Sequence, residues 1–167
     1  MTDKKIILGI ILITILILGG GMFLLTKSSS APSQTVTLSQ NAKVEALEKT
    51  FDWGVIKYSG DKATKTFIIK NTGSDLLKLY NIKTSCACTK ANLTIDGKLS
   101  PDFGMHTQSS WTGEVAAGKD AILNVVFDQT FHGPTGVGPM ERLISMQTND
   151  LSSPTLEFKL TGNVVKD

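Results

Sequence analysis

Apolar residues recur at every second position in several segments after about residue 46. Phe67 and Ile69 alternate in this way within 65–71, and the segments 121–127 and 155–162 repeat the pattern. A period of two predicts β-strands that bury one face. Turn-forming residues separate the segments, and no long helical period is found past the first 25 residues. The pattern therefore predicts an all-β sandwich over residues 46–167, with about six to eight strands.

The alternation also predicts which side chains form the core of this sandwich. One segment changes phase, because Leu77 and Leu79 alternate and the next apolar position is Ile82. A β-bulge near Tyr80 and Asn81 would absorb this slip. The predicted core contains Phe67, Ile69, Leu79, Ile82, Leu123, Val125, Phe127, Ile144, Met146, Leu156, Phe158 and Leu160.

A different pattern opens the chain. Residues 6–25 form an apolar run of about twenty residues, the length that a helix needs to cross ~30 Å of hydrocarbon. A cleavable signal peptide is the alternative, but its apolar region usually runs about 7–15 residues and ends at an A-x-A-like site. The sequence therefore predicts one N-terminal transmembrane helix. Residues 26–45, rich in Ser, Thr and Gln, are predicted to be a flexible stalk.

Charge sets the expected orientation and excludes one class of partner. Lys4 and Lys5 precede the apolar run, so residues 1–5 are expected to be a cytoplasmic stub and the sandwich to be extracytoplasmic. This predicts a single-pass protein of the cell membrane, with another envelope protein as partner. The net charge is only +2 and aromatic residues make up 7% of the chain, so nucleic acid is not expected to bind.

The segment "KTSCACTKANL" at 83–93 holds both cysteines of the chain, Cys86 and Cys88. In an extended strand their Cα atoms would lie about 6.6 Å apart, at the upper edge of the ~4.4–6.8 Å that a disulfide accepts. Closing so short a loop contributes only roughly 1.6 kcal/mol. A disulfide here is therefore expected to be labile and better suited to redox chemistry than to stapling.

Two cysteine thiolates on one face also form half of a site for Cu(I) or Zn. The two histidines lie in loops that also carry methionine, because Met105 precedes His106 and Met140 follows His132 by eight residues. These loops would have to fold over the same end of the sandwich. The candidate ligands are Cys86, Cys88, Met105, His106, His132 and Met140.

A purely structural role is the alternative for these residues. The cysteines would be small buried hydrophobes, and the loop histidines would bond to backbone groups. Trp111 is expected either to cover the site or to pack its own loop onto the sheet. Ser109 and Ser110 lie near His106, but no nucleophile elbow accompanies them, so no enzymatic activity is expected.

Several stretches of the chain resemble a known family. "TFDWGVIKYSGDKATKTFIIKNTGSDLLKLYNIKTSCACT", then "AAGKDAILNVVFD", "ISMQTND" and "LEFKLTGNV", are similar in order to the bacterial domain of unknown function 1573, across residues 51–164. The resemblance implies an exported or membrane-anchored immunoglobulin-like sandwich, similar to major-sperm-protein and ASH domains. Two features depart from the family: Ala87 replaces a common glycine, and residues 93–115 carry an insertion.

Two functions follow from these observations. The leading hypothesis is a membrane-tethered, non-enzymatic extracytoplasmic docking module. The alternative is a copper-binding or thiol-redox accessory protein that uses Cys86 and Cys88 together with the loop histidines and methionines.

Overall fold

The computed structural model describes residues 2–26 and 36–166. The chain divides into two units, residues 1–34 and residues 35–167. Nine of the twenty residues of the predicted stalk at 26–45, residues 27–35, lie outside the described residues. Its last part, from residue 36 onward, belongs to the second unit.

The first unit contains one helix, α1 (Thr2–Thr26). It covers the apolar run at 6–25, so the helix predicted there is confirmed. Within the described residues, no helix meets the length and apolarity required of a membrane span. The membrane crossing expected of 6–25 is therefore not shown by the structure.

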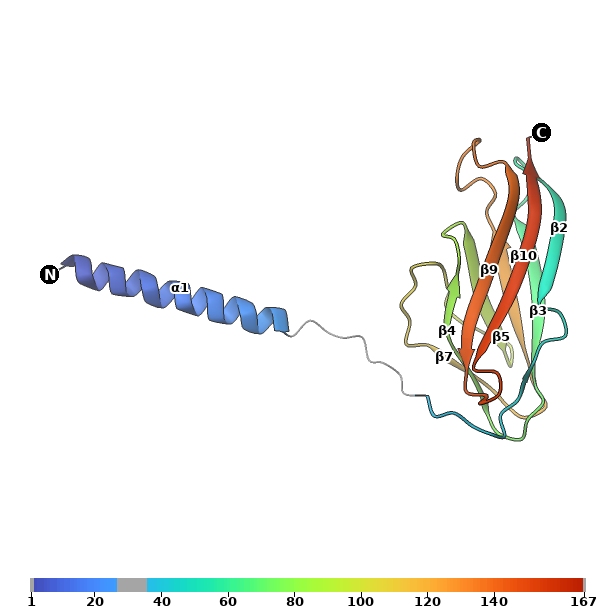
Figure 1. Ribbon diagram of the computed structural model, residues 1–167, viewed down its shortest axis with the longest axis horizontal. Helices are drawn as coiled ribbons and strands as arrows, with labels where there is room; N and C mark the ends of the chain where they lie inside the picture. Colours follow the sequence, from blue (N-terminus) through green and yellow to red (C-terminus); the bar gives the residue numbers. More distant parts are fainter. Residues whose placement is uncertain (1, 27–35, 167) are drawn as a thin grey trace. The chain divides into compact units, whose positions relative to one another are not determined.

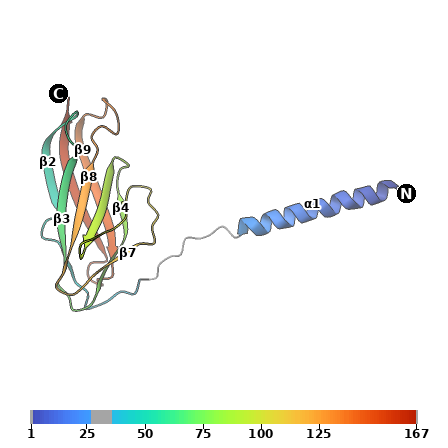
Figure 2. The same ribbon diagram turned by 180° about the vertical axis from the view of Figure 1, so that it is seen from behind.

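The second unit is a sandwich of two five-stranded sheets (Figures 1 and 2). The first sheet has the order β1 (Val44–Glu45), β3 (Ala63–Asn71), β8 (Asp120–Phe127), β5 (Thr89–Ile95) and β6 (Lys98–Leu99). The second has the order β2 (Thr50–Lys57), β10 (Thr155–Val165), β9 (Gly138–Thr148), β4 (Leu77–Thr84) and β7 (Thr112–Val115). The predicted β-sandwich is confirmed. The described residues form ten strands rather than six to eight. Two of the ten, β1 and β6, are only two residues long, which is too short for an alternating pattern to be recognised in the sequence.

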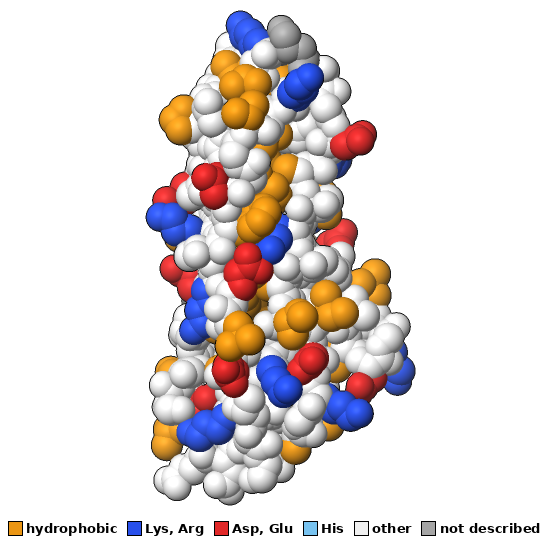
Figure 3. Space-filling model, turned by 90° about the vertical axis from the view of Figure 1, so that its right-hand side faces the viewer, with side chains coloured by type: hydrophobic (Ala, Val, Ile, Leu, Met, Phe, Trp, Pro, Cys, Tyr) orange, Lys and Arg blue, Asp and Glu red, His pale blue; other side chains and the backbone are white. Residues whose placement is uncertain are grey.

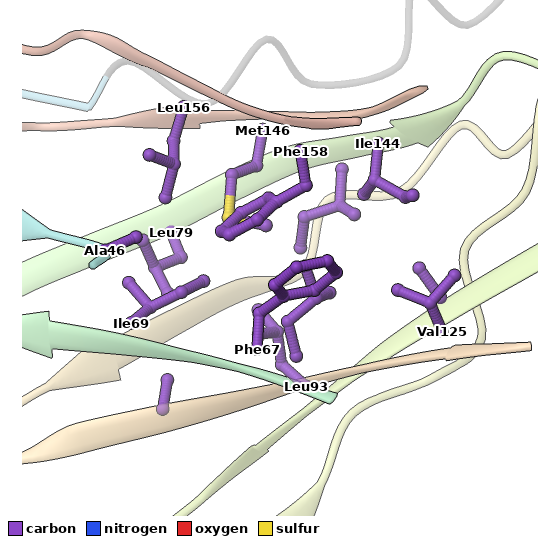
Figure 4. Packing of buried hydrophobic residues seen from close by; sticks show 14 of the residues in the cluster. Ala46, Phe67, Ile69, Leu79, Leu93, Val125, Ile144, Met146, Leu156 and Phe158 are labelled. Carbon is purple, nitrogen blue, oxygen red and sulfur yellow. The ribbon is translucent and has the colours of Figure 1, made fainter. Parts of the chain in front are cut away.

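The core fills the space between the inner faces of the two sheets (Figure 4). All twelve side chains predicted for the core are buried. Phe67 of β3 and Phe158 of β10 meet across the sandwich with ring centroids 4.8 Å apart. The insertion adds buried residues that the alternation did not single out, among them Leu93 and Phe103. Full burial of each such side chain contributes roughly 1.5–3 kcal/mol.

The predicted change of phase in β4 is also confirmed. The register between β4 and β9 shifts between Tyr80 and Lys83, and Asn81 takes a positive φ of 51°. Asparagine tolerates this left-handed conformation better than most residues. The bulge returns Ile82 to the buried face that Leu79 occupies.

The sandwich begins before residue 46, where its start was predicted. Ser39 forms a bridge with Asp150, and Ala42 is fully buried. The backbone N–H of Val44 donates to the Asp150 carboxylate at 3.0 Å. Gly73 packs so closely on this segment that a Cβ there would overlap the Asn41 carbonyl oxygen. A polar sequence thus joins the fold because a buried carboxylate and a close glycine hold its backbone.

Asp150 is the buried carboxylate at the centre of this attachment, with its side chain only 2% exposed. Burial alone would raise its pKa, but hydrogen bonds from Ser152, the Val44 N–H and Lys43 outweigh burial and lower the pKa to about 2. In the unfolded chain the pKa of an aspartate is about 3.9. The stabilisation is therefore complete above pH ~4 and is lost as the pH falls toward 2.

Replacing Asp150 with Asn tests this contribution. We expect the loss in unfolding free energy relative to wild type to be larger at pH 6 than at pH 2 by roughly 2 kcal/mol, because only the wild type gains from the lowered pKa. Urea unfolding at both pH values measures it. Asp61→Asn, which removes a carboxylate from an exposed position, is the control. A loss for Asp150→Asn that does not change with pH would contradict the prediction.

Candidate functional site

The turn between β4 and β5 carries the chain from one sheet to the other and holds both cysteines. Thr84 closes it, since its hydroxyl donates to the Cys86 and Thr89 carbonyls at 2.9 and 3.1 Å. The strand therefore ends before the cysteines. Their Cα atoms lie 5.2 Å apart rather than at the extended spacing, and the sulfurs form a disulfide. This separation lies within the range that disulfides accept.

The two sulfurs have different surroundings. Cys88 is 2% exposed and packs with Ile56, Phe127 and Val164 in a small apolar cluster. Cys86 is half-buried at the edge of that cluster. The backbone N–H of Cys88 donates to the Cys86 sulfur at 3.3 Å. A reagent from solvent therefore meets the sulfur of Cys86 before that of Cys88.

Arg142 on β9 is the only arginine in the chain, and its Nε donates to the Cys88 sulfur at 3.1 Å. Its guanidinium lies 5.2 Å from the centroid of the Phe127 ring. Burial lowers the pKa of Arg142 from its usual value, yet arginine stays charged in proteins. A positive charge therefore lies against the less accessible sulfur. Sequence reasoning missed this residue, although its being the lone arginine among sixteen lysines was a signal.

His132 reaches the other sulfur from the loop between β8 and β9. The backbone N–H of Asp128 donates to the Cys88 carbonyl at 2.9 Å, which joins this loop to the cysteine turn. The Asp128 carboxylate accepts from Lys62 and from Thr130, and these bonds lower its pKa to about 2. Beyond this anchored start, the Nε2 atom of His132 lies 3.4 Å from the Cys86 sulfur.

The glycines of this loop let it bend back over the cysteine turn. Gly133 has a φ of 70°, which glycine adopts without strain. At Gly136 a Cβ would lie 2.8 Å from the Cβ of His132, so only glycine fits there without a shift. The loop and the cysteine turn meet at the same end of the sandwich (Figure 1).

Four of the six predicted ligands therefore come together. The ligand atoms of Cys86, Cys88 and His132 all lie within 4.8 Å of one another, the one such group among the described residues. Met140, at the start of β9, packs against the same apolar cluster. This arrangement suits either thiol–disulfide exchange or, once the sulfurs are reduced, the binding of a soft metal ion.

The structure does not bring the remaining two candidates to this end. Met105 and His106 are exposed in the loop that leads from Phe103 to β7, and His106 is not in the three-ligand group. Phe103 packs in the main core and pairs with Trp111, with ring centroids 5.4 Å apart. Trp111 thus packs the insertion onto the sandwich, as one of its two expected roles proposed, and it is not among the residues of the cluster around the cysteines.

Comparison with protein families matches residues 44–102 to a family described as "Protein of unknown function (DUF1573)". The resemblance found in the sequence is confirmed over this part of the chain, which includes the cysteine turn. No curated protein matches the sequence.

Solved structures that are similar to this chain come from several organisms. A protein of unknown function from Porphyromonas gingivalis W83 has a TM-score of 0.56 at 19% identity, over 79% of this chain and 51% of that chain. This chain thus spans about half of that protein's length. The PapD-like domain 7 of human CEP192 has a TM-score of 0.49 at 17% identity, over 84% of this chain and 97% of that chain. The E. coli chaperone DraB has a TM-score of 0.45 at 8% identity, over 74% and 56%. The first likeness shows the fold alone.

Proposed function

We propose that the sandwich is a non-enzymatic extracytoplasmic binding module that offers the Cys86–Cys88 disulfide to a thiol-bearing partner protein. It would act as a thiol-redox accessory protein, which joins the two functions that the sequence left open. The observation that carries the proposal is the unequal environment of the two sulfurs. Cys86 is half-buried, whereas Cys88 is buried with the Arg142 Nε 3.1 Å from its sulfur.

This asymmetry assigns a role to each cysteine in exchange. A thiolate of the partner attacks the Cys86 sulfur, the S–S bond breaks, and Cys88 leaves as a thiolate. Arg142 stabilises the negative charge that forms on Cys88. In the mixed disulfide, the first sulfur of the partner is bonded to Cys86. The second thiolate of the partner then attacks that first sulfur and releases Cys86 as a thiolate. The domain disulfide is thereby reduced by two electrons, and the partner dithiol is oxidised to a disulfide.

The surroundings of Cys86 supply a surface on which a partner can dock. Phe131 is 53% exposed beside the His132 ring, with ring centroids 5.1 Å apart. Exposed aromatic groups of this kind are typical anchors of protein contacts. On the face seen in Figure 3, by contrast, apolar side chains form small patches divided by charged ones. The proposed contact is therefore centred on Cys86, Phe131 and His132.

Replacing Arg142 with Gln tests the assigned roles. We expect reduction by glutathione to slow by about tenfold or more, because a hydrogen bond to a charged group is worth roughly 1.5–3 kcal/mol. Rapid quenching with an alkylating agent measures the rate, and mass spectrometry locates the glutathione. It should be attached to Cys86. Lys83→Gln removes an equal charge from an exposed position of β4 and should leave the rate unchanged. Equal rates for Arg142→Gln and wild type, or glutathione on Cys88, would refute the roles.

The extracytoplasmic location is the part of the proposal that rests on the sequence. The apolar run at 6–25 would tether the domain, and Lys4 and Lys5 would keep the N-terminus in the cytoplasm. Protease added to spheroplasts that produce the full chain should digest the sandwich. Addition after lysis is the control for its intrinsic sensitivity. Digestion only after lysis would show that the sandwich is cytoplasmic.

A further inference from the structure

The group formed by Cys86, Cys88 and His132 has a spacing that suits a metal ion once the disulfide is reduced. A three-coordinate ion with bonds of about 2.0–2.3 Å holds its ligand atoms roughly 3.5–4 Å apart. The His132 Nε2 already lies 3.4 Å from the Cys86 sulfur, and all three ligand atoms lie within 4.8 Å of one another. Breaking the S–S bond frees the two sulfurs to separate toward this spacing.

The ligand chemistry favours Cu(I) over Zn. Two thiolates and one imidazole form a soft set, and the group has three members rather than the four that structural zinc sites use. Met140 packs against the same cluster. Its thioether is a soft ligand that suits Cu(I), whereas the usual ligands of zinc are Cys, His, Asp and Glu.

The charge balance of the site also favours Cu(I) over Zn. Arg142 donates to the Cys88 sulfur and carries one positive charge. Two thiolates are neutralised by this guanidinium together with one monovalent cation. A divalent ion would leave an uncompensated positive charge beside the apolar cluster of Ile56, Phe127 and Val164, which is costly in such surroundings.

We infer that the reduced domain binds one Cu(I) ion through Cys86, Cys88 and His132, and that the disulfide form does not. The disulfide accepts two electrons from a thiol or phosphine reductant, the S–S bond breaks, and each sulfur takes a proton. Cu(I) then replaces both protons, because the thiolate is the metal ligand. The inference rests on the proposed function only in requiring that Cys86–Cys88 be reducible. His132 is exposed, so the ion has an entry path from solvent.

The test uses the full chain in detergent, reduced with a phosphine and titrated anaerobically with Cu(I) against a chromogenic Cu(I) chelator. We expect one Cu(I) per reduced chain and none per oxidised chain. His132→Ala should weaken binding by about 100-fold or more, because changes even to groups outside the ligand shell cost 10–100-fold. His106→Ala is the matched control, since it removes the other histidine of the chain, and it should bind like wild type. X-ray absorption should report two sulfur ligands and one nitrogen ligand.

Each outcome bears on the inference separately from the proposed function. Wild-type affinity in His132→Ala, a loss in His106→Ala, or tighter binding of Zn than of Cu(I) would overturn the inference. Because a phosphine reduces the disulfide without any partner, Cu(I) binding is measured even if thiol exchange fails. Exchange without Cu(I) binding would leave the proposed function standing and remove the metal.

Discussion

Burial of the two inner sheet faces against each other is the constraint on which the rest of the domain depends. Phe67 and Phe158 meet in the core between the two sheets. The longer strands contribute their alternate residues to this core, and the short strands pair with them at the sheet edges. A chain that fills both sheets of a sandwich has to cross between them repeatedly. The turn from β4 to β5 is one such crossing. The backbone is no longer extended there, and the two cysteines lie within disulfide distance.

The chemistry of the site follows from the position of that crossing. Because β9 neighbours β4, a side chain on β9 can reach the buried sulfur, and Arg142 does so. Because the loop after β8 is bonded to the cysteine turn through Cys88, its histidine lies over the accessible sulfur. One sulfur thus faces a fixed cation and apolar groups, while the other faces solvent and an imidazole. A dithiol pair with two unlike sulfurs can exchange in a directed order, which is what the proposed redox role requires.

The sequence predicted those features that a local repeat encodes. The twelve side chains that strand alternation assigned to the core are all buried, and the slip between Leu79 and Ile82 located the bulge. Features that depend on contacts between distant segments were not predictable in this way. The hydrophobic pattern does not predict that Arg142 donates to the Cys88 sulfur, or that Asp150 binds the backbone at Val44. His106 and His132 looked equivalent in sequence, and only the path of each loop separates them.

We infer that Cys86–Cys88 is a functional pair and that the disulfide is not what holds the fold together. Urea unfolding of the sandwich domain, with the disulfide intact and after reduction, distinguishes these two roles. A loop this short contributes only roughly 1.6 kcal/mol, so we expect the reduced domain to stay folded, with an unfolding free energy lower by no more than about 2 kcal/mol. A reduced domain that has lost its cooperative unfolding transition would show that the disulfide holds the fold together, and would contradict a functional role for the pair.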